Sequence, residues 1–536
     1  MELTIRIAGA QGEGIETTGR MLATTFSKLG YHVFGFRQYA SIIKGNPTMF
    51  FQLHISDRKI YSHGPWKKYD LLIALNKESL AAYEGGARHV ISEREIPLAD
   101  IAAKYGSRIM KNTAALGALS ALLGVDPRHI EAEIRREFRD SIAESNAEVL
   151  YKAFEYSEKN LPKVRQMAKV GESHVLMSGA EVLALGAVMA GMQFYAAYPM
   201  TPASPILHWL AEHGPKHGVV VIQPEDEIAA INMAIGAGYA GVRAAVGTSG
   251  GGFDLMHEAF GLAGMVEVPV VVFLAQRGGP STGVPTETEQ SDLKMALAPA
   301  HGEFPHVVIA PRWIDEGPYA VAKAFNIAEK YQLPVIVLVD LYYTESLATV
   351  EFDPTRFKIE RGELLRGPAV WEEYKRYKIT ESGVSPRSIP GTPGGMYIAT
   401  SDEHDERGDV ITDRHLPEVR KVMHAKRMRK LEKVAEEMEP PLISEGEVLA
   451  VAWGSTSMPL LDYRNGVGIA LFRDIYPLPG GGWVETFNKS KEVVVVEMNY
   501  SGQFAEYLTS RGIKVSRKVS KWWGEPLSVD ELGEWL

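Results

Sequence analysis

Three residues in the middle of the chain have types and settings that suit recognition of a carboxylate beside a functional acid. Glu227 stands at the start of a long apolar run with helical character, where burial and the helix dipole both act on a carboxylate. Thr201 lies in a turn stiffened by two prolines, so a nearly fixed backbone presents its hydroxyl. Arg277 follows a β-type run, and its planar guanidinium matches a carboxylate with two parallel hydrogen bonds.

Each of these residues also has an ordinary structural explanation. A carboxylate at the position of Glu227 commonly caps its own helix, and a shift of one or two positions would transfer the role to Glu225 or Asp226. Thr201 would then be a turn residue and Arg277 a surface cation after a strand. Residue type and spacing leave both explanations open.

Glycine-rich segments follow other β-type runs. One begins with Thr248, Ser249 and Gly250, and its backbone can present amide groups to a cofactor or to a facing subunit. Another, Gly9-Ala10-Gln11-Gly12-Glu13-Gly14, lies between a strand and a helix near the N-terminus. Its second glycine is displaced from the G-x-G-x-x-G pattern, so NAD binding is disfavoured. A tight structural turn is the alternative explanation.

Composition excludes several classes of function. The chain has 536 residues, 45% of them hydrophobic, which indicates a globular protein of two to four domains. The formal charge of -10 disfavours nucleic acid and anionic lipid as partners. No apolar run reaches the roughly 18 residues of a membrane span, and the N-terminus leads into a strand rather than an export signal, so we expect a cytoplasmic protein without membrane contact. Because cysteine is absent, this chain cannot hold disulfides, a thiolate zinc site or an iron–sulfur cluster.

Alternating β-type runs and helical patterns predict the α/β fold class, with three α/β domains. The predicted strands include 3–8, 49–55, 71–75, 219–222, 268–274, 333–340, 448–453, 469–472 and 493–497, and the predicted helices include 112–123, 128–138, 227–240 and 417–437. The expected domains are 1–165, 173–350 and 440–536, with a long connection and a charged helix at 351–439. The charged stretch 155–172 is predicted to be a linker.

The glycine-rich segments, the proline-stiffened turn and the polar residues described above occur in a characteristic order and spacing. In this respect the chain resembles the α subunit of the 2-oxoacid:ferredoxin oxidoreductases, in the form whose γ domain is fused at the N-terminus. The resemblance spans nearly the whole chain, with landmarks at 9–14, 198–202, 227, 277–283, 402–406, 452–455 and 497–503. It implies a Rossmann-like γ domain, a thiamine-diphosphate pyrimidine-binding domain and a transketolase C-terminal-like domain. Members decarboxylate a 2-oxoacid on thiamine diphosphate, pass two electrons to ferredoxin and form an acyl-CoA.

The resemblance also implies residue roles. Glu227 is the expected catalytic residue, because a carboxylate against the aminopyrimidine N1′ favours the imino tautomer that removes the thiazolium C2 proton. The residues expected to bind substrate are Tyr198, Thr201 and Arg277, and those expected to contact the cofactor are Pro199, Thr248, Ser249 and Gly250. The residues expected along the path of CoA are Gly12, Gly14, Ser41, Lys44, Gly45 and Asn46, for which a structural turn and a solvated lysine are the alternatives. We expect no metal ligands in this chain, and a solvated polar loop is the expected setting of His404 and the acids around it.

Half of the cofactor site is missing from the sequence. The diphosphate and its Mg²⁺ require a Gly-Asp-Gly type motif with a downstream asparagine, and the sequence has none. The resemblance therefore implies a β subunit that carries the diphosphate–Mg²⁺ site and a [4Fe-4S] cluster, in an αβ or (αβ)2 assembly that uses ferredoxin, a 2-oxoacid and CoA.

The substrate and two other classes of function stay open. The fused arrangement favours 2-oxoglutarate or broad 2-oxoacid use, while pyruvate and indolepyruvate are alternatives. A catalytically empty scaffold subunit would keep the fold without needing Glu227, Thr201 or Arg277. A nicotinamide-linked oxidoreductase would place its chemistry in the first domain and would bind NAD(H).

Overall fold

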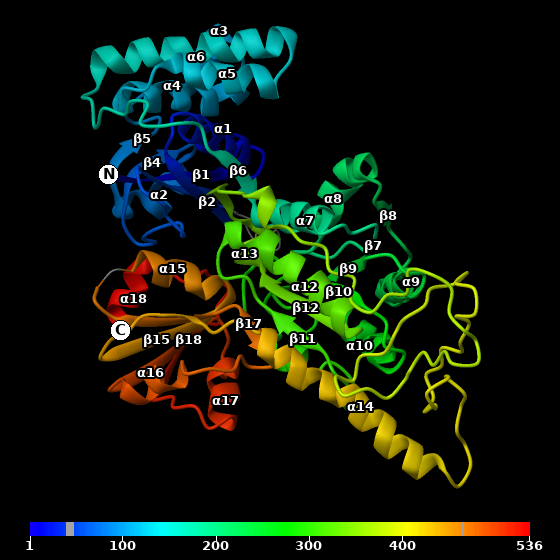
Figure 1. Cartoon of the computed structure of the whole chain (residues 1–536). Coiled ribbons are helices and arrows are strands. Elements are labelled where there is room, and N and C mark those ends of the chain that lie inside the picture. Colours follow the sequence, from blue (N-terminus) through cyan, green and yellow to red (C-terminus); the bar gives the residue numbers. More distant parts are fainter. Residues whose placement is uncertain (39–47, 464) are drawn as a thin grey trace.

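Three β-sheets, each covered by helices, build the chain. The computed structural model describes residues 1–38, 48–463 and 465–536. The N-terminal part, the middle part and the C-terminal part form three bodies, and a long connection runs from the second to the third (Figure 1). The predicted α/β class with three α/β domains is confirmed.

The N-terminal sheet is mixed. Its seven strands, in spatial order, are β5 (Ala87–Ile91), β4 (Tyr69–Ala74), β1 (Glu2–Ala10), β3 (Thr48–Ser56), β2 (His32–Gln38), β13 (Leu347–Val350) and β6 (Val175–Ser178). β1 pairs parallel with β4 but antiparallel with β3. The helices of this part are α1 (Ile15–Lys28), α2 (Lys77–Tyr83), α3 (Leu98–Tyr105), α4 (Lys111–Leu123), α5 (Pro127–Glu137) and α6 (Asp140–Asn160). Helices α3 to α6 form a layer at the outer end of the body (Figure 1).

Two features of this body differ from the sequence-based expectation. The stretch predicted as a linker from residue 155 begins inside α6, because Leu150, Ala153 and Ser157 recur at helical spacing and are all buried. The strands β6 and β13 come from the range predicted for the second domain, yet they pair with each other and extend the N-terminal sheet through β2. The first and second bodies are therefore joined through shared strands.

The middle sheet is almost entirely parallel. Its order is β17 (Asp474–Tyr476), β11 (Val307–Ile309), β12 (Pro334–Asp340), β10 (Val270–Gln276), β9 (Ala244–Thr248), β7 (Phe194–Ala196) and β8 (Val220–Ile222). β12 and β10 are buried along their whole length, as expected for strands covered on both faces. The helices are α7 (Gly179–Met189), α8 (Ser204–His213), α9 (Glu227–Tyr239), α10 (Gly250–Met265), α11 (Leu293–Leu297), α12 (Gly317–Tyr331) and α13 (Leu341–Glu345).

The C-terminal sheet is smaller. Its order is β14 (Leu442–Ile443), β16 (Gly468–Phe472), β15 (Val448–Trp453), β18 (Glu492–Glu497) and β19 (Arg517–Ser520), with α15 (Ser457–Asp462), α16 (Val484–Lys489), α17 (Gln503–Ser510) and α18 (Val529–Trp535). β17 lies between β16 and β18 in the chain but leaves this sheet and pairs antiparallel with β11 of the middle sheet. That pairing fixes the two bodies together at one sheet edge.

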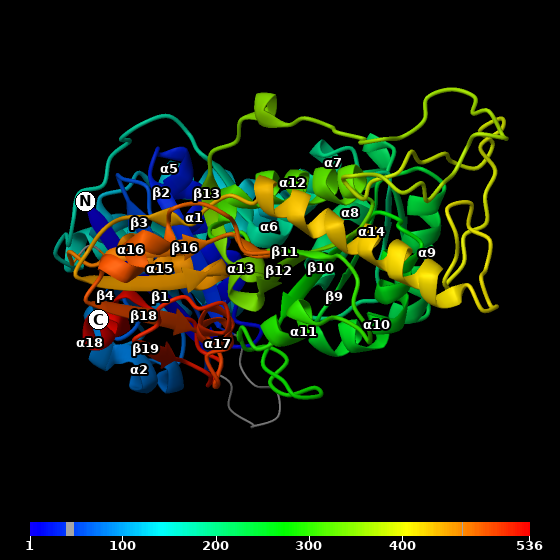
Figure 2. The ribbon, with the colours of Figure 1, turned by 60° about the horizontal axis from the view of Figure 1, so that its bottom comes forward.

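The connection 351–439 ends in α14 (Leu416–Glu437), which runs across the middle body (Figure 2). Most of this helix is polar, and the residues that it buries include Lys426 and Lys430. Both ammonium groups bind the carboxylate of Glu267, at 2.7 Å from Lys426 Nζ to Oε1 and 2.6 Å from Lys430 Nζ to Oε2. A charged helix can pack here because each buried lysine finds its partner in the segment just before β10.

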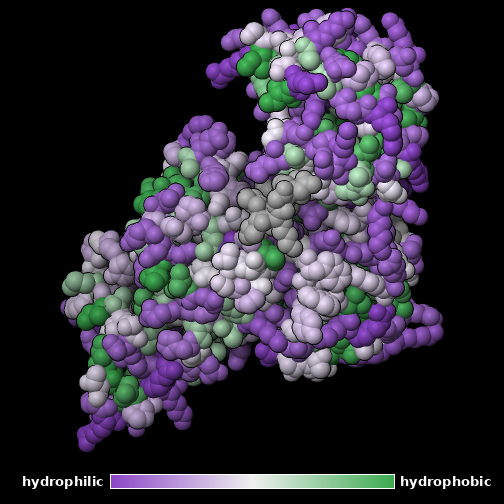
Figure 3. Space-filling model, turned by 180° about the vertical axis from the view of Figure 1, so that it is seen from behind, coloured by the Kyte–Doolittle hydropathy of each residue, from purple (hydrophilic) through white to green (hydrophobic). Residues whose placement is uncertain are grey.

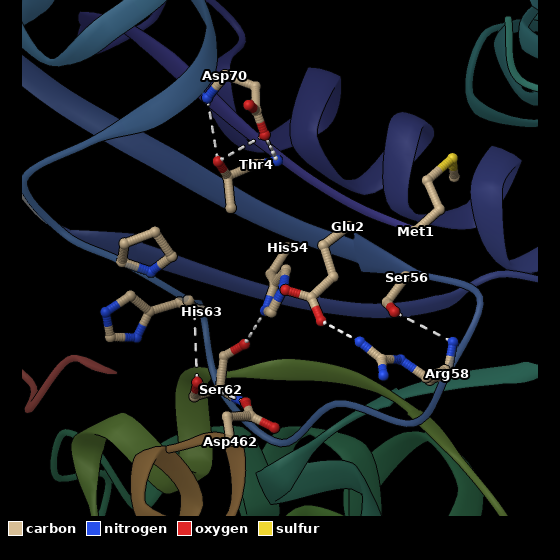
Figure 4. A network of polar contacts seen from close by, with 12 residues as sticks. Met1, Glu2, Thr4, His54, Ser56, Arg58, Ser62, His63, Asp70 and Asp462 are labelled. Carbon is tan, nitrogen blue, oxygen red and sulfur yellow. Dashed lines mark hydrogen bonds and ion pairs between the residues drawn. The ribbon is translucent and has the colours of Figure 1, made fainter. Parts of the chain in front are cut away.

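The segment between β3 and β4 ties the N-terminal body to both other bodies. Asp462, the last residue of α15, accepts hydrogen bonds from Ser62 N at 2.8 Å and from Ser62 Oγ at 2.7 Å (Figure 4). His63 Nδ1 lies 2.7 Å from the hydroxyl of Tyr342 in α13. These buried polar contacts fix the N-terminal body against the other two.

Among the helices in the described ranges, none combines the length and apolar character that crossing a bilayer requires.

Candidate cofactor and substrate site

The predicted site residues follow four adjacent parallel strands. In the order β10, β9, β7, β8, the strands lead into Arg277, the segment 248–250, the segment 198–201 and Glu227, with Thr248 as the last residue of β9. Parallel strands place their carboxyl ends at one edge of the sheet, where ligands collect in open α/β folds. The topology therefore brings together the residues predicted to bind substrate and those predicted to contact the cofactor.

Glu227 is a buried carboxylate with a free oxygen. It is the first residue of α9, and its side chain is only 4% exposed. Capping of this helix is performed by its neighbour Asp226, whose Oδ1 accepts a hydrogen bond from Ala229 N at 2.8 Å, while Glu225 is exposed. Glu227 Oε1 has no hydrogen-bond partner among the described residues. The capping explanation thus applies to Asp226, which leaves Glu227 available to a ligand.

The first turn of α10 lies against this carboxylate. A β-carbon added at Gly252 would lie 2.8 Å from Glu227 Oε1 and 2.1 Å from Thr248 Oγ1, so only glycine fits there. Ser249 is the N-cap residue of this 16-residue helix, but its side chain makes no capping bond and its buried Oγ has no partner in the described parts of the chain. Buried polar atoms are normally satisfied, so this pair of exceptions indicates a place that a polar ligand completes.

Arg277 and Thr201 meet directly. Arg277 Nη1 donates a hydrogen bond to the backbone oxygen of Thr201 at 2.9 Å. No other hydrogen bond of this guanidinium is formed with the described residues, so its remaining donors are available. Burial lowers the pKa of Arg277, whereas the charge of Asp292 acts in the opposite direction. Tyr198 is exposed and Pro199 half-buried at the rim of the same turn.

Asp292 also lies at this edge of the sheet, although residue type and spacing do not predict it as a site residue. Burial raises its pKa to about 7, with Asp254 and Glu289 acting in the same direction and Arg277 opposing them. Its position before Leu293 gives only the signal of an ordinary helix cap. Its place beside Arg277 depends on the fold, since the two residues are separated by a long loop.

The N-terminal glycine loop is closed by its own acid. Glu13 Oε2 accepts hydrogen bonds from Ala10 N and from Asn76 Nδ2, both at 2.7 Å, and Oε1 binds Lys111. Gly14 is the left-handed N-cap residue of α1, and a β-carbon there would lie 2.5 Å from Asn112 Nδ2. This geometry supports the structural explanation for Gly14.

Of the other residues predicted along the CoA path, Gly12 has open space around it. Gly12 is also left-handed, and a β-carbon there would meet nothing within 4 Å. Ser41, Lys44, Gly45 and Asn46 lie outside the described residues.

Within the described ranges, no group of three or more His, Asp or Glu side chains could hold a metal ion. His404 is buried rather than solvated, and its Nδ1 lies 2.9 Å from Asp402 O. The expected solvated setting of His404 is therefore wrong, because its ring packs against Tyr377 with the ring centroids 4.2 Å apart.

The residues present fit one half of a thiamine-diphosphate site. Glu227 supplies a free, buried carboxylate oxygen of the kind that pairs with the pyrimidine N1′. Ser249 and the first-turn amides of α10 add donors beside it. No comparable set of metal-ligating side chains is present among the described residues.

Comparison with known proteins places the chain in a family. Residues 185–424 match the family model "Pyruvate flavodoxin/ferredoxin oxidoreductase, thiamine diP-bdg", and residues 4–156 match "Pyruvate ferredoxin/flavodoxin oxidoreductase". The chain is 31% identical to "2-oxoacid:ferredoxin oxidoreductase 1, subunit alpha" of Sulfurisphaera tokodaii, with 100% of this chain and 97% of that protein covered. It is 29% identical to "2-oxoglutarate oxidoreductase subunit KorA" of Mycobacterium tuberculosis, with 100% and 91% covered.

A solved structure agrees over the same length. The "2-oxoglutarate:ferredoxin oxidoreductase from Magnetococcus marinus with 2-oxoglutarate, coenzyme A and succinyl-CoA bound" has a TM-score of 0.91 and 30% identity, with 99% of both chains covered. Sequence relatives and structural neighbour thus agree along the whole chain, and the polar edge described above falls within the thiamine-diphosphate-binding match. The chain belongs to the 2-oxoacid:ferredoxin oxidoreductase family, as an α subunit with a γ domain fused at its N-terminus.

Proposed function

We propose that this chain supplies one half of a thiamine-diphosphate site at which a 2-oxoacid is oxidatively decarboxylated to CO2 and an acyl-CoA, with electrons passed to ferredoxin. The observation that carries this proposal is the buried Glu227 Oε1, which has no hydrogen-bond partner in the part of the chain that the structure describes. When bound, thiamine diphosphate supplies the electron sink that decarboxylation requires.

The residues of this chain bind, orient and hold protons. Glu227 holds the proton at the pyrimidine N1′, because its free oxygen lies in a site from which water is largely excluded. Arg277 and Thr201 bind the substrate carboxylate, with the guanidinium held in place by its bond to the Thr201 backbone. Orientation by fixed groups lowers the barrier without further chemistry.

The other half of the site is proposed to lie on a β subunit. The two helices that meet at Glu227 carry exposed apolar side chains, which are Ile228 at 48% and Met233 at 39% on α9 and Leu255 at 53% on α10. Hydrophobic patches are also visible on the middle body in the view from behind (Figure 3). The chain has no cysteine, so a [4Fe-4S] cluster must be held by a partner, which we propose also carries Mg²⁺ and the diphosphate, in an αβ or (αβ)2 assembly.

The favoured substrate is 2-oxoglutarate. The solved relative with a TM-score of 0.91 was captured with 2-oxoglutarate and coenzyme A, and the Mycobacterium tuberculosis relative is named for the same acid. The Sulfurisphaera tokodaii relative carries the broader name 2-oxoacid, so pyruvate and indolepyruvate stay as alternatives. A non-catalytic scaffold would have no need of a free buried acid at Glu227.

Substitution of Glu227 in the complex reconstituted with its β partner tests the proposal. We expect Glu227→Gln to lower ferredoxin-linked turnover by about 10²- to 10⁴-fold, as for loss of a proton-transfer residue. Bound thiamine should remain, while the circular-dichroism signal of the imino tautomer should disappear. The measurements are turnover on a panel of 2-oxoacids, thiamine and iron analysis, and the near-ultraviolet spectrum.

Asp226→Asn is the matched control, because it changes the adjacent acid that caps the helix. We expect it to keep turnover within a small factor of wild type and to cost at most about 1 kcal/mol of stability. Unchanged turnover in Glu227→Gln would favour the scaffold alternative. Turnover by this chain alone would contradict a site shared between two subunits.

A further inference from the structure

Asp292 lies beside Arg277 at the polar edge but has no role in the function proposed above. Its backbone N–H donates a hydrogen bond to Gln276 Oε1 at 3.0 Å. Gln276 is the last residue of β10, directly before Arg277, and its Nε2 donates in turn to Val339 O at 3.2 Å. The strand that presents Arg277 therefore also fixes the backbone of Asp292.

The carboxyl group of Asp292 is directed at α10 rather than at its own helix. Asp292 is the N-cap residue of α11, but its side chain makes no capping bond. A β-carbon at Gly250 would lie 2.5 Å from Oδ2 and 2.8 Å from Oδ1, so the carboxyl group packs against the first residue of α10. Oδ2 is shielded from solvent and has no hydrogen-bond partner among the described residues. Burial without a donor disfavours the ionised form.

The charges around Asp292 come from three directions. Asp254 on α10 and Glu289 on the loop before α11 disfavour a negative charge on Asp292. Arg277, which follows β10, favours that charge. Lys294 on α11 is engaged by Glu506, 2.5 Å away. His257 on α10 lies 3.8 Å from Asp254 and offsets part of that charge only when the imidazole is protonated. Among the described residues, the cation that acts on Asp292 is thus Arg277, the residue proposed to bind the substrate carboxylate.

We propose that Asp292 is a positioning residue that takes up a proton when the 2-oxoacid binds, so that Arg277 faces one carboxylate at a time. In the free site the ionised Asp292 shares the attraction of Arg277. When the substrate carboxylate arrives, its charge is added to those of Asp254 and Glu289, and Asp292 is neutralised. The proton comes from solvent, because Asp292 as a whole is half-buried rather than fully buried. The inference rests on the proposed role of Arg277.

Burial and the two neighbouring acids raise the pKa of Asp292 to about 7. The proposed proton uptake therefore falls within the pH range of ordinary enzyme assays. Below this pH the group is already neutral, and substrate binding needs no proton. Above it, every binding event must take up one proton, so the apparent affinity falls by up to about tenfold for each pH unit. The effect is on KM rather than on kcat.

The test is the KM for the 2-oxoacid that the reconstituted complex turns over fastest, measured from about pH 6 to about pH 9. We expect the wild-type KM to rise above about pH 7, and the KM of Asp292→Asn to stay flat at the low-pH wild-type value. Because Asp292→Asn mimics the neutral acid, its kcat should stay within about threefold of wild type.

Asp254→Asn is the matched control. It removes a like charge but leaves Asp292 in place, so the rise in KM should persist and begin at a lower pH. A purely structural role for Asp292 would change stability or kcat without removing the pH dependence of KM. An active Asp292→Asn complex that keeps the wild-type slope would overturn the proposal, as would a flat wild-type profile.

Thermal unfolding of the full chain gives a second readout. Because the folded pKa of Asp292 lies above that of an unfolded aspartate, the unfolded state ionises first as pH rises. The Tm of wild type should therefore fall relative to that of Asp292→Asn between about pH 4 and about pH 7, and the difference should be constant above. A constant difference throughout would show that Asp292 does not titrate as proposed. A complex without any 2-oxoacid turnover would overturn the proposed function and the coupling together, whereas a retained slope overturns the coupling alone.

Discussion

The two edges of the middle sheet differ in whether a buried carboxylate has hydrogen-bond partners. At the amino ends of the strands, Glu267 is completely buried and both of its carboxylate oxygens bind ammonium groups of α14. At the carboxyl ends, Glu227 is almost as deeply buried, but Oε1 has no partner in the described structure. A buried glutamate therefore has both oxygens paired at the amino edge, which we call the saturated edge. At the carboxyl edge, which we call the open edge, a buried glutamate keeps one oxygen unpaired in the described structure.

A second network repeats the pattern at the amino edge. Arg243, the residue directly before β9, donates to Glu329 at 3.3 Å, and Arg387 of the long connection donates to the same carboxylate at 3.2 Å. The connection 351–439 thus supplies cations that neutralise acids at this edge. The comparison shows that one edge is built for stability, while the other keeps polar groups available for a ligand, at a cost in stability.

The largest predicted effect is at the saturated edge. Glu267→Gln leaves two buried lysines without their carboxylate, so we expect a loss of about 3–5 kcal/mol in the free energy of unfolding. Urea unfolding measures it, with the exposed Glu225→Gln as a control that should stay within about 0.5 kcal/mol of wild type. A loss below about 1 kcal/mol at Glu267 would mean that the two edges do not differ in the way described.

The next effect is at the open edge. In Gly252→Ala the new β-carbon would meet Glu227 Oε1 at 2.8 Å and Thr248 Oγ1 at 2.1 Å, so the carboxylate must move. We expect turnover of the reconstituted complex to fall by about 100-fold, because small misplacements of catalytic groups have effects of this size. Gly251→Ala is the matched control for stability, since its β-carbon meets nothing within 4 Å in this chain. Full activity in Gly252→Ala would argue against a role for Glu227.

Arg277→Lys tests recognition at the same edge. Lysine keeps the charge but loses the planar fork, so we expect the KM for the 2-oxoacid to rise by about 10- to 100-fold with a smaller change in kcat. Steady-state kinetics on the complex measure this split. A KM within about threefold of wild type would transfer carboxylate recognition to the partner subunit.

The smallest effects on stability are expected in the N-terminal glycine loop. This loop resembles the saturated edge because both carboxylate oxygens of Glu13 have partners. Gly12→Ala should lower the free energy of unfolding by about 1 kcal/mol, because alanine is strained in this left-handed conformation although its β-carbon would meet no other atom. Gly14→Ala should cost about 2 kcal/mol, because the β-carbon also meets Asn112. Urea unfolding ranks the two variants. A rise in the KM for CoA in Gly12→Ala alone would place the CoA path over the open side of this loop.

Local pattern was enough to predict many elements. The strands at 268–274 and 333–340 and the helices at 227–240 and 417–437 were predicted from apolar runs and periodicity, and the structure contains them with shifts of one or two residues. Short strands such as β6, β13 and β17 were missed. Each has three or four residues, too few for a periodic signal, and each is stabilised by pairing with a distant segment.

The sequence by itself determined the family, the order of the motifs and the absence of any cysteine ligand, because these depend only on residue identity along the chain. It left three neighbouring acids, Glu225, Asp226 and Glu227, as candidates for one role. Only the tertiary structure decided that Asp226 caps the helix and that Glu227 is buried with a free oxygen. It also placed Asp292 beside Arg277 and Lys426 against Glu267, 159 positions away. Burial and hydrogen-bond satisfaction are properties of neighbours brought together by the fold, so no local pattern encodes them.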